Sequence, residues 1–184
     1  MIDEIIKFNE KFVEDKSYQQ YVASKYPDKK LAIVSCMDTR LTELLPAALG
    51  LRNGDAKFIK NAGGVISHPF GSVMRSLIIA IYELDVKDVM VVAHSDCGTC
   101  KLDSSNIIDK MKERGISQQS LDLVEFCGVD YNSWLRGFDN LEESVRQTMR
   151  FITENPLIPK DVGVHGFVID SHSGLLTKIA SNQE

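Results

Sequence analysis

The chain has 184 residues, 43% of them hydrophobic, with a formal net charge of −5 and a pI near 5.4. Its length and apolar content suit one globular domain over residues 1–184, and the acidic balance argues against a nucleic-acid-binding protein. No apolar run approaches the roughly 20 residues that span a bilayer, and the N-terminus shows no basic start followed by an apolar block, which argues against a secretory signal.

The chain contains four cysteines. In a chain of this length without a visible signal, they are more typical of reduced thiols or metal ligands than of a disulfide framework. We therefore expect a cytoplasmic protein with no nucleic-acid or membrane partner.

In the N-terminal half, the predicted elements begin with an N-terminal helical arm of about residues 1–26. There, apolar residues recur at helical spacing up to about residue 22, which predicts one or two amphipathic helices. The pattern next predicts a strand at 31–35, a short helix at 41–49 and a strand at 57–60 that runs into a glycine-containing turn at 61–64. A helix at 70–84 is apolar on most faces, so we expect it between the sheet and another layer or subunit.

The second half begins with a predicted strand at 86–93. Residues around 104–126 and 139–154 have helical patterns, and we interpret 162–169 as the last strand. Alternating helices and near-continuous apolar strands predict an α/β fold with a mostly parallel central sheet flanked by helices. In such sheets, sites gather beyond the carboxyl ends of the strands, where Cys36, Asn61 and His94 would lie.

Three potential metal ligands follow two of these strands. Cys36 follows the first strand, and His94 and Cys97 follow the strand at 86–93. If the two strands are neighbours, two thiolates and an imidazole converge, which suits zinc and leaves a fourth coordination position open. The residues alone leave alternatives: Cys36 as a buried apolar residue, or Cys97 and Cys100 as a redox pair.

The remaining cysteines have separate interpretations. Cys100 could complete a closed four-ligand structural site, or it could point elsewhere from a following helix. We interpret Cys127 as a core thiol.

Asp38 and Arg40 lie two residues apart in the loop after the first strand. They could project to one side and pair beside the metal, where Arg40 would keep Asp38 ionised and oriented. Such a carboxylate could accept a hydrogen bond from water at the open position. The alternative is an exposed salt bridge, which contributes little to stability.

These motifs resemble those of the β-class carbonic anhydrases. The matching segments, in chain order, are Cys36-Met-Asp38-Thr-Arg40, Asn61-Ala-Gly63-Gly64 and His94-Ser-Asp-Cys97-Gly98. The likeness covers about residues 28 to 180 and is closest to the short, single-domain branch of that family. The chain departs from the common pattern in carrying Ala93 where many members have glycine and Lys60 where arginine is common.

The resemblance implies a zinc site and its function. Cys36, His94 and Cys97 would hold Zn²⁺, and Asp38 and Arg40 would form the catalytic dyad, with Asp38 as a fourth ligand in a closed state of the site. The backbone of Gly63 and Gly64 would line the substrate pocket. The activity would be reversible hydration of carbon dioxide to bicarbonate by a metal-bound hydroxide, in a homodimer or higher homo-oligomer.

Other functions compete with this one. Relatives of the family hydrolyse carbonyl sulfide or carbon disulfide with the same metal set. A non-catalytic, zinc-stabilised interaction protein is disfavoured because a structural site has no use for an oriented carboxylate. His68 is a candidate proton relay, although we favour its interpretation as an exposed loop histidine.

Overall fold

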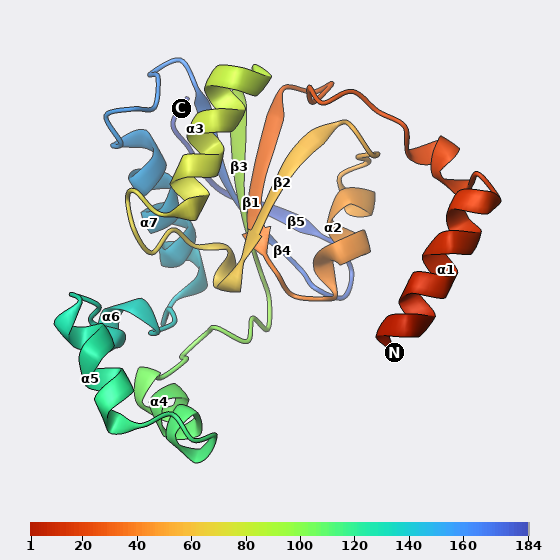
Figure 1. The fold of residues 1–184 in the computed structure, drawn as a ribbon. Helices are drawn as coiled ribbons and strands as arrows, with labels where there is room; N and C mark the ends of the chain where they lie inside the picture. Colours follow the sequence, from red (N-terminus) through yellow and green to blue (C-terminus); the bar gives the residue numbers. More distant parts are fainter. Residues whose placement is uncertain (184) are drawn as a thin grey trace.

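The computed structural model describes residues 1–183 and is built on a five-stranded sheet in the order β2-β1-β3-β4-β5 (Figure 1). The first four strands pair in parallel, and β5 runs antiparallel to β4. This confirms the mostly parallel α/β prediction. The strands are β1 (Leu31–Cys36), β2 (Ala56–Asn61), β3 (Asp88–His94), β4 (Gly163–Ile169) and β5 (Leu176–Ser181).

The helices follow the predicted order with one addition. The region 104–126, predicted to be helical, forms two helices, and Gly115 between them adopts a left-handed backbone (φ 91°). A short helix, α6, lies in a region without a predicted element. The helices are α1 (Ile2–Glu14), α2 (Leu41–Ala48), α3 (Ser72–Leu84), α4 (Ser104–Glu113), α5 (Gln118–Phe126), α6 (Tyr131–Trp134) and α7 (Leu141–Thr153), with 3₁₀ turns η1 (Ser17–Tyr21) and η2 (Ala62–Gly64).

Strand β5 corrects the expectation that 162–169 is the last strand. Within the described part of the chain it pairs with β4 alone and forms one edge of the sheet. Thr177 and Lys178 are both exposed. An edge strand of this kind lacks the continuous apolar run that identifies a buried parallel strand, so its signal in the sequence is weak.

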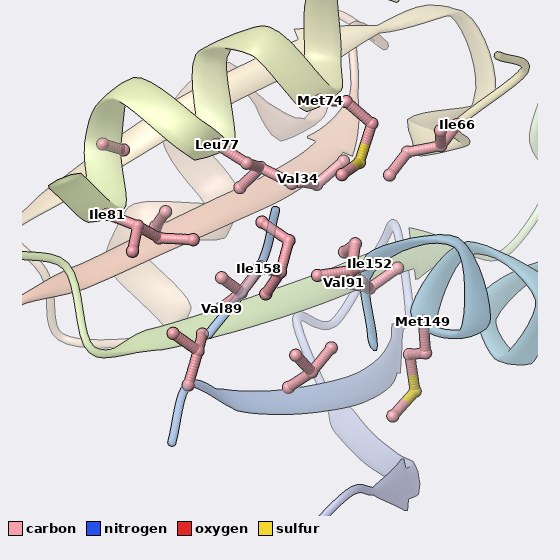
Figure 2. Packing of buried hydrophobic residues seen from close by; sticks show 14 of the residues in the cluster. Val34, Ile66, Met74, Leu77, Ile81, Val89, Val91, Met149, Ile152 and Ile158 are labelled. Carbon is pink, nitrogen blue, oxygen red and sulfur yellow. The ribbon is translucent and has the colours of Figure 1, made fainter. Parts of the chain in front are cut away.

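Helices cover both faces of the sheet. Figure 2 shows buried side chains of α3 (Met74, Leu77 and Ile81) and α7 (Met149 and Ile152) on one face of the sheet, where α3 packs against β1 and β2 and α7 against β3 and β4. On the other face, Leu41 and Leu45 of α2 pack with Ile33 of β1. Because successive side chains of a strand point to opposite faces, β1 contributes to both clusters and is almost wholly buried.

The parallel register brings the candidate site together at the carboxyl ends of the central strands. Strand β1 lies between β2 and β3, with Cys36 opposite Asn61 and Ser35 opposite Val92. His94, the last residue of β3, therefore ends beside Cys36. The predicted gathering of Cys36, Asn61 and His94 at the carboxyl ends of the strands is confirmed.

The N-terminal arm extends away from the sheet (Figure 1). Its helix α1 buries no residue, and the prediction of one or two helices in this region is confirmed by α1 and η1. The apolar residues of α1 at helical spacing are exposed: Ile2, Ile5, Ile6, Phe8 and Val13. Among the described residues, every helix is too short or too polar to cross a membrane.

Candidate metal centre

The three predicted ligands meet at the carboxyl ends of β1 and β3. The Sγ atoms of Cys36 and Cys97 and a ring nitrogen of His94 all lie within 4.8 Å of one another. The two sulfur atoms are 3.8 Å apart. All three residues are buried, so their donor atoms face each other in an environment with little access to bulk water.

The hydrogen bonding of His94 leaves one ring nitrogen without a partner. Its Nδ1 lies 2.8 Å from the backbone carbonyl oxygen of Ser95, which can only accept, so Nδ1 carries the hydrogen. Nε2 then bears a lone pair, and it is buried without a hydrogen-bond partner among the residues that the structure describes. An unsatisfied buried nitrogen typically costs about 1–3 kcal/mol, unless another group takes its lone pair.

A zinc ion fits this donor set. Two cysteine sulfurs and a neutral imidazole nitrogen are typical zinc ligands, and three protein ligands are typical of catalytic rather than structural sites. The backbone carbonyl that fixes the His94 tautomer is the kind of partner that metal-binding histidines use. Burial raises the pKa of the Cys36 thiol, although backbone hydrogen bonds at Asp38 and Gly63 act in the opposite direction. A cation would favour the thiolate instead.

Asp38 and Arg40 form the predicted pair beside these donors. Arg40 donates from Nε to Asp38 Oδ1 (3.0 Å) and from Nη2 to Asp38 Oδ2 (2.8 Å), and the backbone amide of Arg40 donates to Oδ1 (2.9 Å). These hydrogen bonds, above all those from the Arg40 side chain, hold the pKa of Asp38 well below its usual range. Oδ2 lies 3.8 Å from His94 Nε2, beyond hydrogen-bond distance.

A second acidic residue at this pair was missed by the sequence reasoning. Asp96 accepts from Arg40 through its carboxylate (Nη1 to Oδ2, 2.9 Å) and its backbone carbonyl (Nη2 to O, 2.8 Å). The available signal was an aspartate between His94 and Cys97. Its direction depends on a left-handed backbone (φ 53°) that the residue type alone does not reveal.

Gly63 and Gly64 lie in η2 against the metal centre, both with positive φ (81° and 66°). A Cβ on Gly64 would lie 2.8 Å from the backbone nitrogen of Cys36. A Cβ on Gly63 would lie 2.7 Å from Thr99 Oγ1, which is itself 3.0 Å from Cys97 Sγ. Each glycine therefore allows a close approach to a ligand segment. Their contact with substrate remains a prediction.

We expect Gly64→Ala to lower the free energy of unfolding by about 3 kcal/mol, because it combines left-handed strain with a clash against the backbone of β1. Urea unfolding at equal zinc loading measures the change. Gly128→Ala is the matched control: its φ is 92°, but a Cβ there meets open space, so strain alone should cost about 1 kcal/mol. Equal losses in the two variants would contradict the close-packing role of Gly64.

The other candidates lie outside the donor cluster. Cys100 is exposed and is not among the three clustered ligands. Cys127 is exposed at the end of α5, so its interpretation as a core thiol is wrong; α5 buries only Leu121 against the rest of the chain. His68 is exposed in a loop, which confirms the interpretation that we favoured.

Comparisons with known proteins agree with this geometry. A family model described as carbonic anhydrase matches residues 31–176. The Bacillus subtilis (strain 168) protein named "Putative carbonic anhydrase YtiB" is 47% identical over 181 residues, which is 98% of this chain and 97% of that protein. The carbon disulfide hydrolase of Acidithiobacillus thiooxidans is 27% identical over 158 residues, which is 81% of this chain and 76% of that protein.

A solved structure supports the same assignment. The crystal structure of beta-carbonic anhydrase isoform I from Trichomonas vaginalis matches with a TM-score of 0.87 and 31% sequence identity, covering 97% of both chains. The chain therefore belongs to the β-class carbonic anhydrase family of enzymes.

Proposed function

We propose that this chain catalyses the zinc-dependent, reversible hydration of carbon dioxide to bicarbonate. Cys36, His94 and Cys97 would hold the ion, and Asp38 and Arg40 would form the catalytic dyad. The observation that carries the proposal is an arginine-bound carboxylate oxygen 3.8 Å from the unpartnered Nε2 of a buried histidine. A purely structural zinc site would not need this carboxylate.

When bound, zinc supplies Lewis acidity that makes water a nucleophile near neutral pH. The side chains of the protein orient that water and keep the carboxylate of Asp38 ionised. Asp38 Oδ2 accepts a hydrogen bond from the water, which turns an oxygen lone pair toward the carbon of the substrate. Arg40 keeps Asp38 ionised, so the carboxylate acts as an acceptor and not as a donor.

The overall reaction consumes carbon dioxide and water and yields bicarbonate and a proton. The new bond joins the water oxygen to the substrate carbon, and the released proton passes to solvent buffer. We propose the backbone of Gly63 and Gly64 as one wall of the substrate pocket, since both are buried beside the ligand segments. In the structure Asp38 is paired with Arg40; its role as a fourth metal ligand in a closed state remains a prediction.

A second candidate is hydrolysis of carbonyl sulfide or carbon disulfide. The similarity to a carbon disulfide hydrolase supports this second candidate. One zinc-loaded sample should be assayed with carbon dioxide, carbonyl sulfide and carbon disulfide. We expect carbon dioxide to give the highest kcat/KM; turnover of a sulfur substrate without carbon dioxide hydration would overturn the main proposal.

We also propose that the chain assembles into a homodimer or a larger homo-oligomer. The exposed apolar side of α1 supports this, because a row of large aliphatic and aromatic side chains is costly to leave in water. Sedimentation velocity of the full chain should show a species of at least twice the chain mass. A stable monomer with full activity would contradict the assembly.

A further inference from the structure

We propose that Asp96 is a positioning residue that holds Arg40, and with it Asp38, in place beside the metal centre. The inference rests on the proposed function, because it assigns a second support to the same dyad. The three residues come from two segments: Asp38 and Arg40 belong to the loop after β1, whereas Asp96 lies after β3, between His94 and Cys97.

The guanidinium of Arg40 is shared between these two segments. Arg40 donates from Nε and Nη2 to the Asp38 carboxylate. It also donates from Nη1 to the carboxylate of Asp96 and from Nη2 to the Asp96 backbone carbonyl. The bonds to Asp38 fix the two side chains relative to each other. The bonds to Asp96 fix the pair relative to the segment that carries His94 and Cys97.

The backbone of Asp96 is shaped for this contact. Its φ of 53° is uncommon for a residue other than glycine, and aspartate tolerates it better than most. This conformation directs both the carbonyl oxygen and the carboxylate of one residue at Arg40. The Asp96 side chain is 80% exposed, so hydrophobic packing does not explain its place.

Charge alone is a weak explanation of this pair. An exposed ion pair contributes little to stability, and the Asp96 carboxylate is open to solvent. Orientation is a different matter, because a planar guanidinium held by four hydrogen bonds from two directions has little freedom to rotate. Without Asp96, only the loop after β1 would determine where the Arg40–Asp38 pair lies.

The test compares Asp96→Gly with Asp96→Asn in the zinc-loaded full chain. Glycine keeps the left-handed backbone and its carbonyl bond but removes the carboxylate; we expect kcat/KM for carbon dioxide to fall about 10- to 100-fold. Asparagine tolerates the same backbone and offers Arg40 an oxygen acceptor, so it should recover most of that loss. A crystal structure of Asp96→Gly should show Arg40 displaced from its place beside Asp38.

Asp85→Gly is the matched control. Asp85 is also exposed, with a left-handed backbone (φ 56°), and it forms ion pairs with Lys30 and Lys87 at the amino ends of β1 and β3, far from the donor cluster. It should keep full activity. Asp96→Gly with wild-type kinetics and an unmoved Arg40 would overturn the inference.

Two further outcomes are separable. If Asp96→Gly loses zinc, the two variants are compared without metal: an Arg40 that is displaced in the Asp96→Gly crystal and restored in Asp96→Asn supports the role of Asp96, and an unmoved Arg40 in Asp96→Gly overturns it. If the wild-type zinc protein itself fails to hydrate carbon dioxide, the proposed function fails. The position of Arg40 in the variant crystal then still decides whether Asp96 holds it.

Discussion

Replacing Asp38 with asparagine is expected to lower kcat for carbon dioxide hydration by about a hundredfold or more while zinc stays bound. The amide has nearly the same shape but no charge, and its NH₂ group would face an N–H donor of Arg40 where Asp38 now accepts. In either orientation of the amide, the variant loses at least one hydrogen bond from Arg40, and where the NH₂ group takes the Oδ2 position it also loses the acceptor for the reacting water. Stopped-flow hydration assays and metal analysis on the same sample measure the two effects.

The control for this variant is Glu143→Gln on α7. Glu143 also pairs with an arginine, Arg150, at 2.6 Å, but it lies on an exposed helix surface. Its loss should leave the rate unchanged. An Asp38→Asn variant with full zinc and wild-type turnover would remove Asp38 from the mechanism.

The direction of the Asp38 pKa shift adds a pH test. Hydrogen bonds from Arg40 lower the pKa of Asp38 in the folded state, so its carboxylate stays ionised even below the usual range of an aspartate and is protonated only as pH falls through the depressed pKa. That value lies below the pH range of an ordinary hydration assay. We therefore expect Asp38 to contribute no inflection to a neutral pH–rate profile, and any inflection there to persist in the residual activity of Asp38→Asn.

Replacing His94 with glutamine or alanine is expected to remove most of the bound zinc and, with it, the activity. Two cysteine sulfurs alone leave the ion with half of a tetrahedral ligand set. In wild type, the imidazole is held by the Ser95 carbonyl with Nε2 free and buried, so binding costs little reorientation. Zinc per chain after dialysis against a weak chelator is the measurement, and it should fall from about one to near zero.

The exposed His172 provides the control, since His172→Ala removes an imidazole without touching the donor cluster. It should keep the zinc stoichiometry of wild type. The glutamine variant separates the loss of a ligand from the cavity that alanine would leave in a fully buried position. Wild-type zinc content in both His94 variants would contradict the assignment of this residue as a ligand.

The sequence predicted the site better than it predicted the periphery. Cys36, His94 and Cys97 follow long apolar strands, and buried parallel strands are among the clearest patterns in an α/β chain. Their convergence followed once β1 and β3 were neighbours. Asp38 and Arg40 were found for the same reason, since they lie in the loop directly after β1.

The errors arose where tertiary context decides. Cys127 follows the apolar residues of α5 and was interpreted as buried, but Leu123 and Phe126 of that helix are themselves exposed. The contact of Asp96 with Arg40 depends on a backbone angle, not on the residue type. Strand β5 was missed because its exposed edge carries polar residues.

The neighbouring placement of β1 and β3 has a consequence for how the ion and the fold depend on each other. The two strands are separated in the chain by α2, β2 and α3, so their donors are far apart until the strands have paired. An ion that binds only when the ends of β1 and β3 lie side by side stabilises the native state relative to the unfolded state. The apparent affinity for zinc therefore depends on the free energy of β1–β3 pairing. A destabilising substitution in the middle of either strand should weaken zinc binding, although all three ligands are unchanged.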